Sequence, residues 1–293
     1  MTLTGRPLLC ATDFSPAANA ALDRAARLAV QHGQPLHLVH VFDWTHHALR
    51  IAFGKEPLLQ LRLQEKLHAT LKETAAGIAG TGATAECELV DGKVAPGIVA
   101  AAAARQAGLV VLGAHGEGLL GTMLGSTVER VLRQGSTATL VVRQHSHGPY
   151  RRVLVATDFS AEANAALRAA LTLAPDAALT VLTVYDPIFE AHVLGSLVQG
   201  TDMASIGEQA RQFVASEMAD AVRLAREVKP ELDTKVIEGN PWRGILQVAE
   251  DINADLIVMG RRGQGRVEAT LLGSATRYVL AHSKVDVLVT HAD

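Results

Sequence analysis

Cysteine and aromatic residues are scarce in this chain, and long apolar runs are missing. Of 293 residues, 2 are cysteine and 4% are aromatic. Cys10 and Cys87 form no CxxC pair and lie in apolar stretches, which favours buried free thiols over a disulfide scaffold. The run IVAAAAA (98–104) is far shorter than the roughly 18–20 apolar residues of a membrane span. The start, MTLTGRPLLCATDFS, lacks the basic-then-apolar pattern of a secretory signal, so we expect a cytoplasmic protein.

A strong charge of one sign is also missing. The chain has 27 Lys and Arg against 30 Asp and Glu, a formal net charge of −3. Because no basic field favours a polyanion, we expect no binding to nucleic acid. Hydrophobic residues make up 48% of the chain and charged residues 19%, as in globular proteins, and the length suffices for two domains with their own cores.

The chain contains the same sequence twice. The segment LLCATDFSPAANAALDRAARLA (8–29) returns as VLVATDFSAEANAALRAALTLA (153–174). Further along, VVLGAHGEGLLGTMLGSTVERVL (110–132) returns as IVMGRRGQGRVEATLLGSATRYVL (257–280). A match in the same order over nearly the whole chain indicates an internal duplication of a repeat of about 145 residues.

The two repeats are joined by a polar stretch. The segment RQHSHGPYRR (143–152) contains Gly-Pro and has no apolar period, which is typical of a linker. We therefore predict two domains, of residues 1–146 and 147–293.

Short apolar runs alternate with helical segments in each repeat. In the first repeat the pattern predicts strands at 8–12, 36–42, 84–90, 109–113 and 138–143, and helices at 16–31, about 57–79, 96–107 and 126–134. The strands are continuous apolar runs, as expected when both faces of a sheet are covered. The predicted fold class is α/β: two tandem doubly wound (flavodoxin/Rossmann-like) domains, each with a five-stranded parallel sheet and helices on both faces.

Two polar features follow strands in each repeat. Asp13 and Asp158 come directly after the first strand, and a glycine-rich loop follows the fourth. If these two strands are neighbours, as in the flavodoxin-like order, the carboxylate and the loop share one cleft beyond the carboxyl ends of the strands. This convergence predicts a ligand site in each repeat.

The second glycine loop, GRRGQGRVEATLLGS (260–274), suits an anion. Gly260 and Gly263 allow positive φ and close backbone approach, and Gly273-Ser274 opens a helix whose first N–H groups lack intrahelical partners. These donors, the serine hydroxyl and the helix dipole fit a phosphate chain. The alternative is that the glycines are turn residues and Ser274 is a helix N-cap. Neither GxxxxGK(S/T) nor GxGxxG fits the spacing of this loop, so it supports neither a P-loop nor a dinucleotide fingerprint.

The motifs ATDFS after the first strand, HVFD after the second and G-x2-G-x9-G-S after the fourth together resemble a tandem universal stress protein. The resemblance covers almost the whole chain, twice. The second repeat has the full spacing, whereas the first has eight residues instead of nine between Gly116 and Gly125.

In ATP-binding members of that family the glycines and the serine hold ribose and phosphates. The aspartate lies by the nucleoside, and a valine offers its backbone to adenine. The resemblance therefore implies one nucleotide site per repeat, made of Asp13, Val41, Gly113, Gly116, Gly125, Ser126 and Thr127 in the first and Asp158, Val184, Gly260, Gly263, Gly273, Ser274 and Ala275 in the second.

Two of these assignments have structural alternatives. The aspartates stand near helix starts, where Ser15 and Ser160 are good N-caps, and the two valines are equally explained as core residues. The expected cofactor is ATP, with Mg²⁺ as an option; we assign no catalytic residue and no metal site.

Other polar residues near the loops leave alternatives open. Arg261 and Arg262 replace the AH of the first loop, and either neutralise phosphates or form a solvated loop face. His115 is expected to be a loop residue rather than a base. The pairs HH (46–47) and HSH (145–147) are not expected to bind a metal, because adjacent histidines on a helix do not share a face.

The function expected from these features is that of a stress sensor or regulator that binds ATP in one or both domains. Slow ATP hydrolysis or self-phosphorylation is the enzymatic alternative, although no Mg²⁺ carboxylate pair accompanies the loop. A third alternative is an interaction protein with decayed sites.

The partners and the assembly are less defined by the sequence. The final strands, 137–143 and 285–291, are apolar, and we predict that their edges pair with each other. The chain would then be a pseudo-dimeric monomer or form a homodimer. We also expect a protein partner, which the sequence does not identify. The full spacer and the two arginines predict that the second domain binds ATP more tightly than the first.

Overall fold

The structure is a computed structural model that describes residues 5–43, 57–114, 125–143, 148–185, 203–263 and 272–292. By compactness the chain divides into two units. The N-terminal unit consists of residues 2–149 and 284–289, and the C-terminal unit of residues 150–283 and 290–293 with residue 1. The N-terminal unit thus takes in most of the last strand of the second repeat.

The N-terminal unit alternates strands and helices as its sequence predicts. Its elements are β1 (Leu8–Ala11), α1 (Pro16–His32), β2 (Leu36–Phe42), α3 (Pro57–Ala76), the 3-10 turn η1 (Ala79–Thr81), β3 (Ala85–Asp91), α4 (Val94–Ala104), β4 (Leu109–Gly113), α5 (Ser126–Gln134), β5 (Ala138–Val142) and β10 (Asp286–Thr290).

The strands of this unit lie in the order β3-β2-β1-β4-β5-β10. All neighbours from β3 to β5 are parallel, and β1 pairs with both β2 and β4, which confirms the expected neighbourhood of the first and fourth strands. The pairing of β5 with β10 is antiparallel, with Val141 opposite Val287. This pairing confirms that the apolar strands within 137–143 and 285–291 cover each other.

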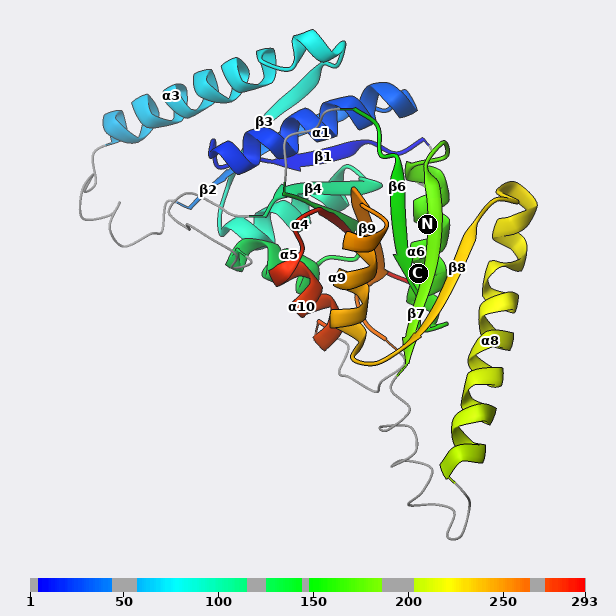
Figure 1. The fold of residues 1–293 in the computed structure, drawn as a ribbon. Coiled ribbons are helices and arrows are strands. Elements are labelled where there is room, and N and C mark those ends of the chain that lie inside the picture. Colours follow the sequence, from blue (N-terminus) through cyan, green and yellow to red (C-terminus); the bar gives the residue numbers. More distant parts are fainter. Residues whose placement is uncertain are drawn as a thin grey trace. The chain divides into compact units, whose positions relative to one another are not determined.

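Helices cover both faces of this sheet, with α1 and α3 on one face and α4 and α5 on the other (Figure 1). Alanines allow α1 to lie close to the strands: Ala21 and Ala25 are fully buried. Leu9, Leu38 and Val111 fill the sheet layer at 0% exposure. The core is therefore built from small helix residues against branched strand residues, as continuous apolar strands require.

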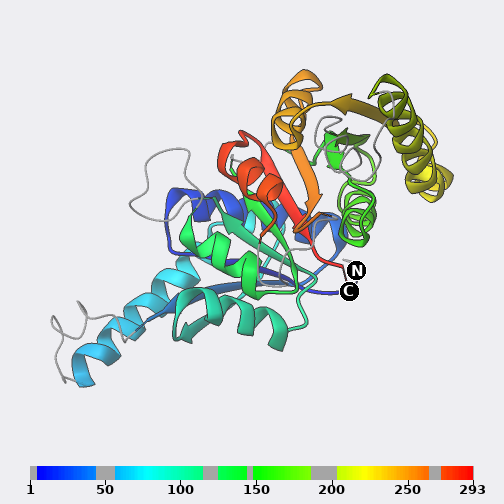
Figure 2. The ribbon, with the colours of Figure 1, turned by 90° about the horizontal axis from the view of Figure 1, so that it is seen from below.

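The C-terminal unit repeats this plan (Figure 2). Its elements are β6 (Arg152–Ala156), α6 (Ala161–Leu173), β7 (Ala178–Tyr185), α8 (Met203–Val228), β8 (Asp233–Glu238), α9 (Pro241–Asp251), β9 (Leu256–Gly260) and α10 (Ser274–His282). Its strands run β9-β6-β7-β8 and pair in parallel, in the same relative order as β4-β1-β2-β3. The α/β fold class with two similar domains is confirmed.

Two predicted helices have bounds that are wrong by a few residues. The helix expected to reach residue 79 ends at Ala76, because Gly77 follows and the chain continues as a 3-10 turn that ends at Gly82 with φ 82°. The helix expected at 96–107 runs from Val94 to Ala104, so Pro96 lies in its first turn, where a missing N–H costs little. In the described part of the chain, no helix combines the length and apolarity that crossing a membrane requires.

Candidate functional site

A tight turn connects β1 to α1 and places the first candidate aspartate. Phe14 has φ 66°, and its N–H donates to Thr12 Oγ1 at 2.9 Å. The N–H of Ser15 donates to Asp13 Oδ1 at 3.1 Å, and Ser15 Oγ accepts the N–H of Ala18 at 3.2 Å. Ser15 is therefore the N-cap, and one oxygen of Asp13 closes the turn before it.

The second repeat makes the same turn. Phe159 has φ 65°, the N–H of Ser160 donates to Asp158 Oδ1 at 3.1 Å, and Ser160 caps α6. The structural alternative noted for the aspartates is thus partly right, because helix entry uses one carboxylate oxygen of each. The sequence signal for this role was the Asp-x-Ser spacing, which is typical of a side chain that accepts from a backbone N–H two residues later.

The first glycine of each loop is required by packing. A Cβ added at Gly113 would lie 2.7 Å from the carbonyl carbon of Ala17, and one added at Gly260 would lie 2.8 Å from Glu162 Cβ. Gly260 and Gly263 are not among the described glycines with positive φ. Of the two properties named for these glycines, positive φ is not used, and close approach to the helix explains the glycine at the loop's start.

The helices after the two loops begin without a side-chain cap. The N-cap residues are Gly125 for α5 and Gly273 for α10, and neither helix start has a side-chain hydrogen bond. Ser126 and Ser274 are the first helical residues, and both are exposed. The alternative in which Ser274 is the N-cap is therefore wrong. Uncapped first-turn N–H groups and the positive end of the helix dipole are features that bind anions.

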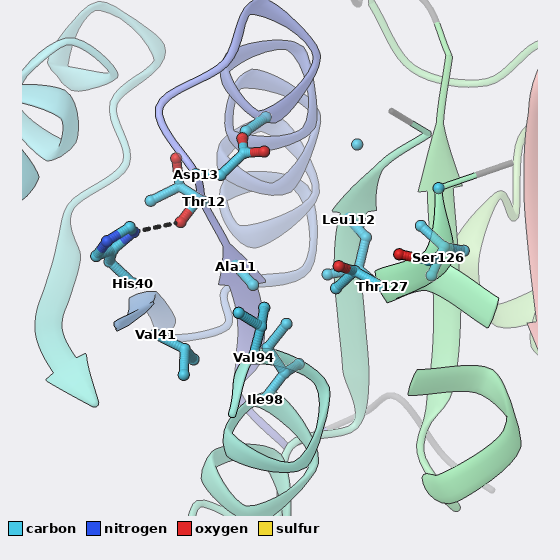
Figure 3. A pocket seen from close by; sticks show the side chains of 14 residues that line it. Ala11, Thr12, Asp13, His40, Val41, Val94, Ile98, Leu112, Ser126 and Thr127 are labelled. Atoms are coloured by element: carbon cyan, nitrogen blue, oxygen red, sulfur yellow. Dashed lines mark hydrogen bonds between the residues drawn. The ribbon is translucent and has the colours of Figure 1, made fainter. Parts of the chain in front are cut away.

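In the N-terminal unit the candidate residues line one cavity of about 300 Å³ (Figure 3). It lies at the carboxyl ends of β1, β2 and β4. Its lining includes every described candidate of the first repeat, namely Asp13, Val41, Gly113, Gly125, Ser126 and Thr127. Gly116 and His115 lie outside the described residues, as do 46–47 and 145–147.

The cavity has an apolar end and a polar end. Val41, Val94 and Ile98 lie together at one end, where Val41 is only 7% exposed. Ser126 and Thr127 mark the other end, at the start of α5. Apolar walls with a few converging polar groups are typical of small-molecule sites.

His40 was missed as a contributor by the sequence reasoning. Its Nδ1 lies 2.8 Å from the carbonyl oxygen of Thr12, and its ring packs against Phe14 with 4.5 Å between centroids. Burial lowers the pKa of His40, although the Thr12 carbonyl and the Asp13 charge act in the opposite direction. Because the neutral ring has one N–H, Nδ1 donates to Thr12, and the contact fixes the backbone just before Asp13. The histidine in HVFD was its only sequence signal.

In the C-terminal unit the loop after β9 also meets the aspartate. A Cβ added at Gly263 would lie 2.5 Å from Asp158 Oδ2, so the backbone of the loop lies against this carboxylate. The N–H of Gly273 donates to the Arg261 carbonyl at 3.0 Å. Val184 packs under Gly244 of α9, whose added Cβ would lie 3.0 Å from both methyl groups of the valine. The expected convergence of aspartate and glycine loop is thus present in this repeat.

The two loop arginines differ in their surroundings. Arg262 forms an ion pair with Glu162, with Nη2 at 2.8 Å and Nε at 3.0 Å from Oε1. Arg261 is half-buried beside His291, and burial with the charges of both arginines lowers the pKa of His291 to about 4. Arg262 is therefore not merely a solvated loop face, because a carboxylate of this chain pairs with it.

The fold and this cavity define a tandem α/β protein whose first repeat has a cavity at the carboxyl ends of its strands. The chain belongs to the universal stress protein family, whose sequence model matches residues 5–143 and again residues 149–291. The duplication seen in the sequence is thus a duplication of one family domain.

Several relatives have one such domain. A universal stress protein encoded in the QAH/OAS sulfhydrylase 3' region of Thermus aquaticus is 33% identical over 144 residues, which is 48% of this chain and 98% of that protein. The stress response protein NhaX of Bacillus subtilis is 30% identical over 161 residues, covering 47% of this chain and 96% of that protein.

Solved structures with two such domains match almost the full length. A universal stress protein from Archaeoglobus fulgidus superposes with a TM-score of 0.68 at 23% identity, covering 98% of both chains. A protein from Pseudomonas aeruginosa described as a putative universal stress protein gives a TM-score of 0.63 at 20% identity, covering 98% of this chain and 94% of that one. These likenesses support the tandem fold.

Proposed function

We propose that this protein binds an adenine nucleotide, ATP in the first place, and acts as a stress sensor or regulator in the cytoplasm. The observation that carries the proposal is the single cavity that gathers all described candidates of the first repeat. A cavity of about 300 Å³ is at the lower end of the range typical of small-molecule sites.

The cavity's polarity matches the parts of a nucleotide. The apolar end at Val41, Val94 and Ile98 suits a base, and in this proposal the backbone of Val41 gives the base its hydrogen bonds. Asp13, at the carboxyl end of β1, also lines the cavity, and its carboxylate would accept hydrogen bonds from ribose hydroxyls. The uncapped start of α5, with the hydroxyls of Ser126 and Thr127, suits the phosphates. Mg²⁺ would then be held chiefly by the phosphates.

The second repeat offers an equivalent set. Gly263 lies against Asp158, Gly273 is the N-cap of the uncapped start of α10, and Ser274 and Ala275 follow in its first turn. Val184 and Gly260 complete the set, one at the end of β7 and the other at the end of β9. We propose that these residues form the second nucleotide site.

Calorimetric titration with ATP tests the proposal. Gly125→Asp should remove the first site and Gly273→Asp the second, because a carboxylate at either N-cap repels phosphate from the donors of the first turn. Losing one or two charge-assisted hydrogen bonds of about 1.5–3 kcal/mol each would weaken a site at least about tenfold. Circular dichroism should show an unchanged fold.

Two results would count against nucleotide binding. One is the absence of ATP heat from the unmodified protein, together with no nucleotide released from it on denaturation. The other is undiminished binding by the variant that carries both Gly125→Asp and Gly273→Asp.

A further inference from the structure

The two repeats differ at one position next to the glycine loop. Ala17 stands at this position in α1, and Glu162 stands at the corresponding position in α6. In both repeats this residue touches the loop's first glycine, Gly113 or Gly260. A side chain longer than that of alanine at this position extends to the loop. Of the two repeats, only the second has such a side chain, that of Glu162.

Glu162 binds the second loop through three hydrogen bonds. Its Oε2 accepts the backbone N–H of Arg262 at 2.5 Å, and its Oε1 accepts Nε and Nη2 of the same residue. The side chain of Glu162 is only 9% exposed, and that of Arg262 is 28% exposed. Charge-assisted and bidentate hydrogen bonds are the strongest that side chains make, and partial burial limits screening by solvent.

The clamped residue is linked to the start of α10. Arg261, which precedes Arg262, accepts the N–H of Gly273 through its carbonyl at 3.0 Å. Thr276, in the first turn of α10, donates its hydroxyl to the Gly260 carbonyl at 2.9 Å. Fixing Arg262 therefore also fixes the backbone that positions the N-cap of the phosphate-facing helix.

We propose that Glu162 is a positioning residue that holds residues 260–263, the start of the second loop, in their nucleotide-binding geometry, so that the second site is the tighter one. This inference rests on the proposed function. A loop that is already ordered loses less conformational freedom when the ligand binds, which raises affinity. Arg262 acts through this clamp, since its charge is matched by Glu162.

Electrostatics and positioning predict opposite effects for Glu162→Ala. If the carboxylate acted only through its charge, removing it would strengthen the binding of an anionic phosphate chain. If Glu162 positions the loop, its removal should weaken the second site by about tenfold, which corresponds to 1.4 kcal/mol. Glu162→Gln keeps an acceptor for the Arg262 N–H and should weaken the site less.

The experiment measures ATP affinity calorimetrically in the full chain carrying Gly125→Asp, so that the second site is read alone. Amide hydrogen exchange at residues 260–263 without nucleotide gives an independent readout and should be faster in Glu162→Ala. Glu227→Ala removes a carboxylate from an exposed pair with Arg223 and is the matched control, expected to change neither quantity.

The outcomes separate the inference from the proposed function. If the chain with Gly125→Asp binds no ATP while Glu162 is intact, nucleotide binding by the second repeat fails, and the inference with it. If this chain binds ATP and Glu162→Ala leaves the affinity equal or raises it, only the positioning role is overturned. Weaker binding, faster exchange and partial rescue by Glu162→Gln together support it.

Discussion

Replacing Gly113 with alanine tests whether the first loop glycine is a packing requirement. The new Cβ would lie 2.7 Å from the carbonyl carbon and oxygen of Ala17 and 2.9 Å from the amide nitrogen of Ala18. These are backbone atoms in the first turn of α1, so no side chain can rotate away. Either the end of β4 or the start of α1 must move.

The expected cost follows from this geometry. Overpacking by a methyl group costs about 1–3 kcal/mol when the surroundings shift, and a backbone contact places Gly113→Ala in the upper part of this range. Because α1 begins directly after the turn that holds Asp13, its displacement should also weaken ATP binding at the first site. The free energy of unfolding is measured by urea titration at pH 7, followed by circular dichroism.

Gly80→Ala is the matched control for this substitution. A Cβ at Gly80 would meet no atom within 4 Å, and its φ is not positive. The change should therefore only reduce the freedom of the unfolded chain, which stabilises by about 0.4–1 kcal/mol. The two substitutions should shift the urea midpoint in opposite directions. A Gly113→Ala protein as stable as the unmodified chain would refute the packing argument.

Two further predictions concern buried charges. The pKa of His291 is lowered from 6.5 to about 4 in the folded protein, so His291 stays neutral there at pH 5. In the unfolded chain the same side chain takes up a proton near pH 6.5. The free energy of unfolding should therefore fall by about 2 kcal/mol between pH 7 and pH 5. His291→Gln should remove this part of the pH dependence of urea unfolding, and an unchanged slope would contradict it. Asp286 pairs with Arg24 at 3.4 Å with both side chains buried, so Asp286→Ala should cost about 3–5 kcal/mol. Asp23→Ala, in an exposed pair, should cost less than about 1 kcal/mol, and equal melting shifts for the two would refute the difference.

Local patterns in the sequence were sufficient for the fold. Continuous apolar runs such as 109–113 predicted strands buried on both faces, and β4 has these bounds. The sequence left the strand order conditional. The pairing of β1 with β4 confirms the neighbourhood that the site argument needed, in the order β3-β2-β1-β4-β5 of a Rossmann-like half rather than the flavodoxin-like order, in which the first and third strands are neighbours. Helix ends were predicted less accurately. A glycine such as Gly77 ends a helix only when the residues after it adopt another conformation, which here is the 3-10 turn η1.

The candidate site could be predicted only where its chemistry is local. Asp13 and the loop glycines carry motif spacings, and those that are described meet at the cavity. The clamp between Glu162 and Arg262 joins residues 100 positions apart, and nothing in their neighbourhoods marks them as partners. The role of Gly113 was also hidden, because a glycine needed for helix contact looks the same in sequence as one needed for a ligand.

The turns before α1 and α6 give a physical reason to assign the aspartates more than a structural role. Phe14 and Phe159 have φ 66° and 65°, a conformation that costs an ordinary residue roughly 1–2 kcal/mol. The serine N-caps alone would start both helices without this strain. Backbone strain persists where surrounding contacts hold it, and it concentrates at functional sites. Here the contacts are the hydrogen bonds that the N–H groups of Phe14 and Ser15 donate to Thr12 Oγ1 and Asp13 Oδ1, and their result is a fixed carboxylate at the carboxyl end of β1. The positive φ of both phenylalanines therefore supports the proposal that the two carboxylates serve the nucleotide sites, because serine N-caps by themselves do not require it.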